Sequence, residues 1–202
     1  MNTFKRILLT SFLFTPFCNA QDGKDLFDLI EDKQEVQLLP ERMIFTQRIL
    51  WGKKGLLRTT GIAPLNNIQR EKELKLRRSM LTTHQVIGYA TLAAMVAQGI
   101  IGAKLHKDWS RSTYDLHKDM ATVVNIGYFT GAGLSLFAPP PLINKKVEGF
   151  SSIKAHKTLA TIHFSAMILT NVVDKYKNNN IHRASAYTAF GSYAVAILVF
   201  KF

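Results

Sequence analysis

The chain has 202 residues, of which 47% are hydrophobic and 20% charged, and its 26 Lys and Arg against 14 Asp and Glu give a formal charge of +12. The length accommodates one domain with short appendages, and the charge suits either nucleic acid or an anionic lipid surface. Residues 81–202 are strongly apolar and no nucleic-acid-binding motif is present. We therefore expect the lipid bilayer, and no nucleic acid, as a partner.

Residues 1–20 have the organisation of a cleavable signal peptide. Lys5 and Arg6 precede an apolar stretch over residues 7–17, and residues 18–20 (CNA) place small residues at the two positions that a signal peptidase reads. The apolar stretch is too short to span a bilayer, which takes about 20 residues. An uncleaved anchor is the alternative.

The chain has a single cysteine, Cys18, which lies inside this leader. The mature chain would then have no thiol. This excludes disulfides, Cys-ligated zinc, Cys-ligated iron–sulfur clusters and covalently attached c-type haem. Any metal chemistry must use histidine, methionine or carboxylate ligands.

Residues 21–80 contain no long apolar run and are expected to form an extracytoplasmic or interfacial segment. Residues 22–33 predict a short acidic helix. Over residues 42–58, basic side chains alternate with aromatic and aliphatic ones, which suits a segment in the lipid headgroup layer. A loop that packs on the helices explains this pattern equally well. A break at residues 61–64 then precedes a basic helix over residues 68–80.

Four apolar segments follow, and together they predict an all-α, integral membrane four-helix bundle over residues 81–202. The first two cover residues 82–103 and 120–143, and three prolines at 139–141 end the second. The third and fourth, residues 158–173 and 184–200, have only 16 and 17 residues. They are long enough to cross a bilayer if lysine and arginine side chains in their first turns extend to the interface.

One histidine stands at the N-terminal entrance of each apolar segment: His84, His117, His156 and His182. In an up-down-up-down bundle, His84 and His156 share one depth near one face, and His117 and His182 share another near the opposite face. A low-spin b-type haem needs two axial nitrogens from facing helices. The pattern therefore predicts two bis-histidine haem b sites, with these four histidines as the metal ligands.

A cation follows three of these histidines, namely Lys118, Lys157 and Arg183. Haem propionates are anionic, so these cations are expected in the cofactor-binding sites. Interface clustering of histidine and lysine at helix ends is the alternative explanation.

Two further histidines lie outside this pattern. His163 lies two helical turns deeper than His156, about 10 Å along the axis. An ionisable group at that depth is a functional candidate, either as a replacement ligand or as a hydrogen-bond partner of a haem edge. A packed histidine bonded to a neighbouring helix is the equal alternative. His106 follows the first apolar segment and is expected to face solvent.

The segments around the four histidines are residues 83–88 (THQVIG), 115–118 (DLHK), 154–157 (KAHK) and 180–183 (NIHR). In this arrangement the chain resembles the cytochrome b561 and ferric-reductase transmembrane family. The resemblance covers about residues 80–202 and implies that His84 pairs with His156 and His117 with His182. It also implies transmembrane electron transfer, with oxidoreductase activity at one face and a small-molecule or protein electron donor and acceptor.

The chain departs from that family in two respects. It lacks the two flanking helices of eukaryotic members, and it has no match to the basic ascorbate-site motif of animal and plant members. A minimal prokaryotic-type member in a bacterial inner membrane is the expectation, and a homodimer is compatible with it. The donor is open between a quinol and a partner protein. A haem-free transporter or proton relay, and a non-catalytic membrane assembly factor, are the alternative functions.

The direction of insertion has conflicting signals. A cleaved leader places residues 21–80 outside the cytoplasm, whereas the basic cluster at residues 70–78 favours the cytoplasmic side under the positive-inside rule. We give the leader more weight, because it sets the first translocation event.

We predict that the mature chain begins at Gln21 and that both of its ends lie outside the cytoplasm. N-terminal sequencing and reporter fusions at the C-terminus measure this. A C-terminus in the cytoplasm would contradict either the helix count or the orientation.

Overall fold

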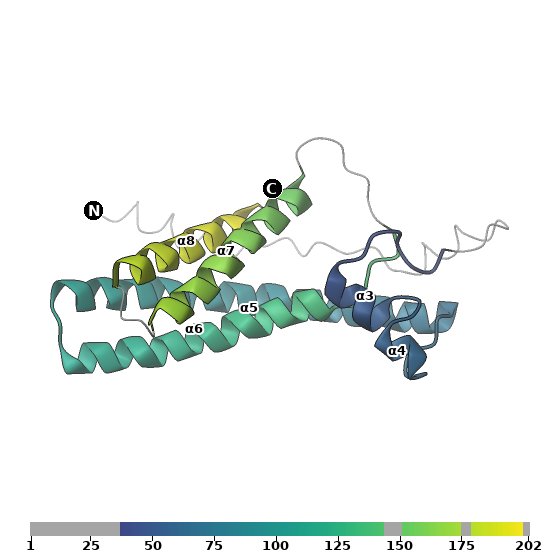
Figure 1. Cartoon of the computed structure of the whole chain (residues 1–202), viewed down its shortest axis with the longest axis horizontal. Coiled ribbons are helices and arrows are strands. Elements are labelled where there is room, and N and C mark those ends of the chain that lie inside the picture. Colours follow the sequence, from purple (N-terminus) through teal and green to yellow (C-terminus); the bar gives the residue numbers. More distant parts are fainter. Residues whose placement is uncertain (1–36, 144–150, 175–178, 200–202) are drawn as a thin grey trace, which may run out of the picture. The chain divides into compact units, whose positions relative to one another are not determined.

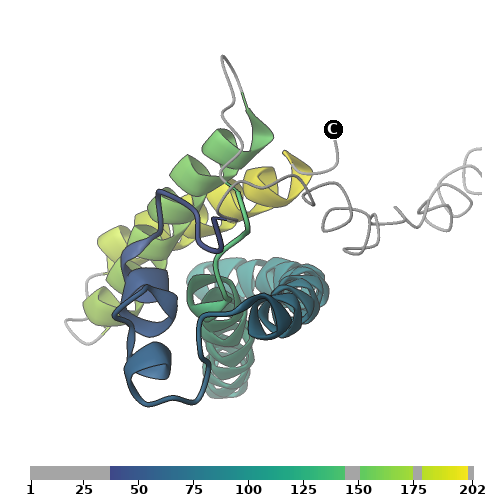
Figure 2. The same cartoon turned by 90° about the vertical axis from the view of Figure 1, so that its right-hand side faces the viewer.

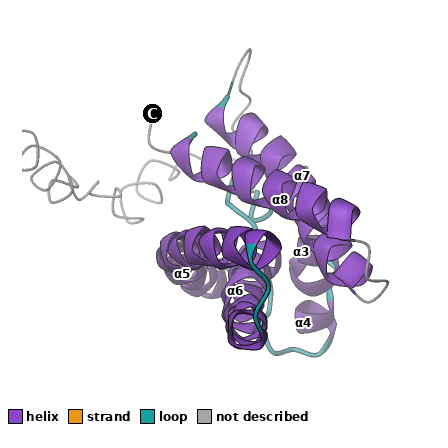
Figure 3. Ribbon diagram, turned by 90° about the vertical axis from the view of Figure 1, so that its left-hand side faces the viewer, coloured by secondary structure: helices purple, strands orange, loops and turns teal. Residues whose placement is uncertain are grey.

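The computed structural model describes residues 37–143, 151–174 and 179–199. In these ranges every regular element is a helix and no strand is present, so the all-α class is confirmed (Figure 3). The helices are α3 (Phe45–Trp51), α4 (Leu56–Thr59), α5 (Asn67–Lys107), α6 (Arg111–Phe137), α7 (Ser152–Asp174) and α8 (Asn179–Leu198). All belong to one compact unit, Leu38–Phe202. The predicted signal peptide and the predicted acidic helix over residues 22–33 lie outside the described residues.

Helix α5 has 41 residues and joins the predicted basic helix to the first apolar segment without interruption. It begins where Asn66 caps it, accepting a hydrogen bond from the Gln69 amide at 2.8 Å. Helix α6 begins in the same way, with the Ser110 hydroxyl accepting from the Thr113 amide at 3.2 Å. Both helices are long and apolar enough to cross a membrane.

The four long helices form two hairpins. Helix α5 packs along α6, and α7 packs along α8. Figures 1 and 2 show these two pairs in perpendicular views, and Figure 3 shows the α7–α8 pair as a second layer against the first. The backbones of α5 and α8 approach each other between the layers.

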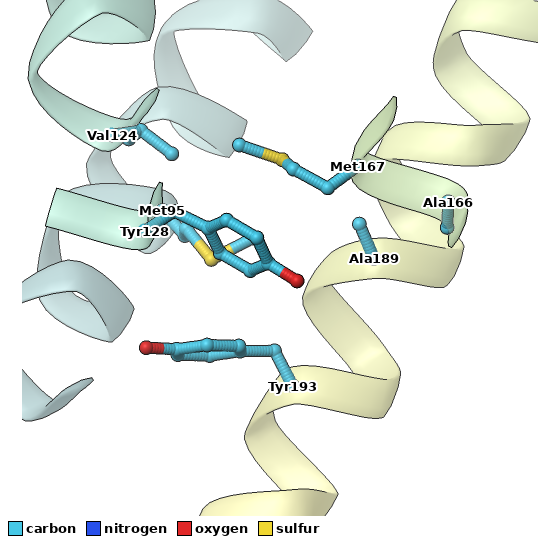
Figure 4. Close-up of a cluster of buried hydrophobic side chains, with 7 residues drawn as sticks. All are labelled: Met95, Val124, Tyr128, Ala166, Met167, Ala189 and Tyr193. Atoms are coloured by element: carbon cyan, nitrogen blue, oxygen red, sulfur yellow. The ribbon is translucent and has the colours of Figure 1, made fainter. Parts of the chain in front are cut away.

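Helices α6 and α7 meet through side chains. The amides of Asn125 and Asn171 exchange two hydrogen bonds, at 2.8 and 3.0 Å. All four helices also contribute to one buried apolar cluster, which Figure 4 shows with the rings of Tyr128 and Tyr193 side by side. Contacts of this kind let polar and aromatic side chains fix the helix register where the surroundings are apolar.

The α5–α6 contact requires a glycine at position 127. A Cβ atom there would lie 2.5 Å from the Thr91 hydroxyl oxygen, well inside contact distance. The absence of a side chain at Gly127 therefore sets how closely these helices approach.

The C-terminal end of α6 is held by side chains from the preceding part of the chain. The carbonyls of the six consecutive residues 136–141 all accept hydrogen bonds. Helix α3 supplies donors to the first three: Thr46 to Leu136 at 2.5 Å, Trp51 to Phe137 at 3.0 Å and Gln47 to Ala138 at 3.1 Å.

Two arginines of α5 serve the other three carbonyls. Arg77 donates to Pro139 at 2.7 Å, and Arg70 donates to Pro140 and Pro141 at 3.1 and 3.4 Å. Three consecutive prolines end the helix because none has an amide hydrogen to continue it. Carbonyls at a helix C-terminus need outside donors, and cations are favoured there by the helix dipole.

Arg70 is fully buried, and a carboxylate offsets its charge. Glu73, also buried, forms ion pairs with Arg70 and Arg58. Burial, followed by repulsion from Arg70, holds the pKa of the nearby Arg77 below its usual value. Two guanidinium groups, those of Arg58 and Arg70, thus pair with the Glu73 carboxylate, while Arg70 and Arg77 donate to the carbonyls of the proline segment.

We predict that Glu73→Gln destabilises the protein by about 3 kcal/mol, because it leaves Arg58 and Arg70 buried without a countercharge. Thermal unfolding of the purified protein in detergent measures the change. Glu71→Gln is the matched control: Glu71 pairs with Lys75 on the surface, where such a pair contributes at most about 1 kcal/mol. Equal effects of the two substitutions would show that the buried cluster is not a main source of stability.

Candidate functional site

The four predicted ligand histidines all lie on the long helices and all are half-buried. His117, His156 and His182 fall within the first two turns of α6, α7 and α8. His84 differs, because α5 begins well before it at Asn67, so this histidine marks the start of the apolar part and not the start of the helix.

Three of these histidines share one hydrogen-bonding arrangement. The Nδ1 atom of His84 lies 2.8 Å from the Gly131 carbonyl oxygen, that of His156 lies 3.1 Å from Ala196 and that of His182 lies 3.2 Å from Thr170. A carbonyl oxygen can only accept, so each Nδ1 carries the proton and each Nε2 carries the lone pair. Metal-binding histidines are typically oriented in this way by a hydrogen bond to their second nitrogen.

His117 is held differently. The side-chain amide of Gln98, on α5, donates to the His117 Nε2 at 3.2 Å and to its carbonyl oxygen at 3.1 Å. The ring also packs against the helix backbone at Gly102, where an added Cβ would lie 3.0 Å from the His117 Cε1. Coordination through the His117 Nε2 would require the Gln98 amide to turn away. The sequence offered no signal for Gln98, since an isolated glutamine in an apolar segment has no motif.

His117 and His182 face each other across the bundle. Their ring centroids are 6.4 Å apart and their planes are inclined at 66°. Imidazole nitrogens lie about 2 Å from a bound metal, so two imidazoles on opposite sides of one ion have centroids roughly 6 Å apart. The observed separation is close to the one that two imidazoles would have if they shared one metal ion.

His84 and His156 lie at one level of the bundle, as a chain of contacts indicates. His156 bonds to Ala196, and one turn earlier on α8 the Tyr193 hydroxyl donates to the Gly88 carbonyl of α5 at 3.3 Å. Gly88 lies one turn after His84.

The two pairs are well separated along the bundle axis. His84 and Gln98, which contacts His117, are 14 residues apart on the same continuous helix. That difference corresponds to about 21 Å of helical rise, within a hydrocarbon layer about 30 Å thick.

His163 lies between the two levels in a set of aromatic side chains. Its Nδ1 is 2.6 Å from the Tyr128 hydroxyl, and its ring centroid lies 5.6 Å from that of Tyr128 and 5.1 Å from that of Tyr193. Of the two sequence-based interpretations, this geometry corresponds to a packed histidine bonded to a neighbouring helix.

The predicted cations lie at the surface. Lys118, Lys157 and Arg183 are all exposed. Arg183 contacts His106 across 2.9 Å, and the Lys118 ammonium lies 6.0 Å from the Tyr114 ring centroid. His106 is exposed, as predicted. These contacts are compatible with cations at the bundle ends and give no direct link to an anionic group.

Within the described ranges, no three histidine, cysteine, aspartate or glutamate side chains gather around a common metal position. Structural zinc sites take four protein ligands and catalytic zinc sites three.

The comparisons with known proteins give no match. No protein-family model matches the chain, and no similar curated protein or solved structure was found. The histidine geometry and the helix composition are therefore the features of the chain that indicate a function.

Proposed function

We propose that the protein is a multi-pass membrane cytochrome that binds two b-type haems and transfers electrons across the bilayer. The facing His117 and His182 rings, 6.4 Å apart, are the single observation that carries the proposal. The signal peptide, the resemblance to the cytochrome b561 and ferric-reductase family and the placement in a bacterial inner membrane belong to the same proposal.

The outer surface of α5 and α6 supports the membrane assignment. Val86, Ile100 and Ile126 are 63, 67 and 65% exposed although they belong to the apolar segments. In a water-soluble bundle such side chains would face the core, whereas in a bilayer they contact lipid. Helices α7 and α8 have 23 and 20 residues, or about 35 and 30 Å of rise, which suits a third and a fourth span.

The histidine tautomers support haem as the cofactor. In His84, His156 and His182 the bond from Nδ1 to a carbonyl puts the lone pair on Nε2, the form that binds iron. Neutral imidazoles add no charge to the hydrocarbon layer, unlike carboxylate ligands. Haem supplies reversible one-electron chemistry when it is bound.

The protein's own contribution is to position and insulate the two sites. Backbone carbonyls of neighbouring helices orient three of the four imidazoles, and the apolar cluster between the two levels excludes water. Surface cations at Lys118, Lys157 and Arg183 are placed to offset propionate charge near the two faces. A small-molecule or protein donor would deliver electrons at one face and an acceptor would remove them at the other.

A haem-free proton relay is the second function that a specific observation favours. The short contact between His163 and Tyr128 places two ionisable groups in the interior of the bundle. A colourless purified protein that is fully folded would support this function over the cytochrome.

We predict that His84→Ala and His156→Ala remove the same haem, and that the double variant is little worse than either single one. His117→Ala and His182→Ala should form a second such group, because both ligands of one iron must lie at one depth. Haem quantification and redox titration of the purified variants measure these effects. The combination His84→Ala with His117→Ala should remove both haems.

One experimental result would contradict the predicted pairing of the four histidines. If His84→Ala and His117→Ala affect one shared haem, the two-level scheme is wrong. His106→Ala is the matched control, since that histidine is exposed and contacts Arg183, and its haem content should equal that of the unchanged protein.

We predict that His163→Ala keeps both haems but shifts the midpoint potential of one haem more than that of the other. The reason is that a polar group in the interior, two turns from His156 on the same helix, tunes the metal without binding it. Tyr128→Phe, which removes only the hydroxyl that contacts His163, should shift the same haem in redox titration. Loss of one haem in His163→Ala, with His156→Ala unaffected, would identify His163 as the ligand on α7.

A further inference from the structure

Helix α3 has two faces of different character, and its contacts with α6 fix which way each one points. Gln47 and Trp51 are buried and donate to carbonyls at the end of α6. Phe45 and Ile49 share another face of the helix and are 74 and 49% exposed. The two hydrogen bonds set the rotation of the helix, so this apolar face cannot turn inward.

The depth of α3 follows from the carbonyls that it contacts. Leu136, Phe137 and Ala138 stand where the apolar segment of α6 ends and the proline run begins. The end of a membrane-spanning segment lies at the boundary between hydrocarbon and headgroups. A helix bonded to that end lies at the same boundary.

The basic residues around α3 indicate what kind of surface covers its apolar face, which carries Phe45 and Ile49. Arg48 is exposed next to Ile49, and Lys53 and Lys54 are exposed in the turn that follows α3. In the described stretch of residues 37–78, ten lysines and arginines stand against three glutamates, a net charge of +7. Basic side chains around an apolar stripe are typical of helices that lie in an anionic lipid surface.

We propose that α3 is an interfacial helix that inserts Phe45 and Ile49 into the headgroup layer of an anionic bilayer, beside the His84 and His156 end of the bundle. This inference rests on the proposed membrane crossing of α5 and α6. Each basic residue near an anionic leaflet favours contact about fivefold. The helix would thereby hold the end of α6, and with it the Gly131 carbonyl that orients His84, at a fixed depth.

The test uses the full chain with Cys18→Ser in lipid nanodiscs, with one spin label at Phe45→Cys, Ile49→Cys, Val86→Cys or Asp108→Cys. Collision with oxygen and with a water-soluble nickel chelate gives the depth of each label. In anionic nanodiscs the labels at 45 and 49 should be several-fold less accessible to nickel than the label at Asp108, which is exposed in the α5–α6 connection. They should also lie shallower than the label at 86.

The charge dependence is the second arm of the experiment. The variant Arg48→Gln, Lys53→Gln, Lys54→Gln, or a zwitterionic bilayer, should raise nickel access at position 45 several-fold and leave position 86 unchanged. Nickel access at 45 equal to that at 108 in anionic nanodiscs would overturn the inference. Protection at 45 that is equally strong in zwitterionic nanodiscs would also overturn it, because anionic lipid would then not be what covers this face.

The experiment separates this inference from the proposed function. A label at 86 that is open to nickel would contradict the membrane crossing itself, and haem content of the same samples tests the cytochrome independently. A label at 86 in lipid with a label at 45 in water would refute only the role of α3.

Discussion

The structure depends on how the end of α6 obtains hydrogen-bond donors. Six consecutive carbonyls at residues 136–141 point away from any partner in their own segment, and the prolines among them contribute no amide hydrogen. Side chains of α3 and α5 supply every donor, and Arg70 supplies two of them from a fully buried position. A buried guanidinium needs both a countercharge and oriented dipoles, and Glu73 and the proline carbonyls provide the two.

This arrangement explains why the basic run before the first apolar segment is so dense. The positive-inside rule treats Arg70, Lys72, Lys75, Arg77 and Arg78 as a topology signal, but Arg70 and Arg77 have structural roles that would hold on either side of a membrane. Two of the five cations are therefore accounted for by packing.

The sequence predicted the helices well where composition alone decides them. The all-α class and the break at residues 61–64 follow from apolar runs and turn-forming residues. The prolines at 139–141 do follow α6, but the helix runs from Arg111 to Phe137 and not from residue 120 to residue 143 as predicted. The sequence could not define the ends of α5, whose predicted basic part (residues 68–80) leads directly into the first apolar segment within one helix from Asn67 to Lys107. It also could not choose between an interfacial and a packed segment over residues 42–58, since the contacts of α3 are about ninety residues away along the chain.

For the candidate site, the positions of the histidines in the sequence predicted their depths in the bundle but not the orientation of their rings. Helix direction alone puts His117 and His182 at one depth, and the structure brings their rings to 6.4 Å. Tautomers depend on carbonyls of other helices, such as Gly131 for His84 and Ala196 for His156, and no local pattern encodes these contacts. The same holds for Gln98, which contacts the atom of His117 that a metal would need. Three imidazoles are thus oriented by backbone that cannot move independently of the fold, whereas the fourth is held by a side chain that can rotate. The asymmetry implies that the rings of His84 and His156 are held more rigidly than that of His117, whose Nε2 can contact another group only if the Gln98 amide rotates.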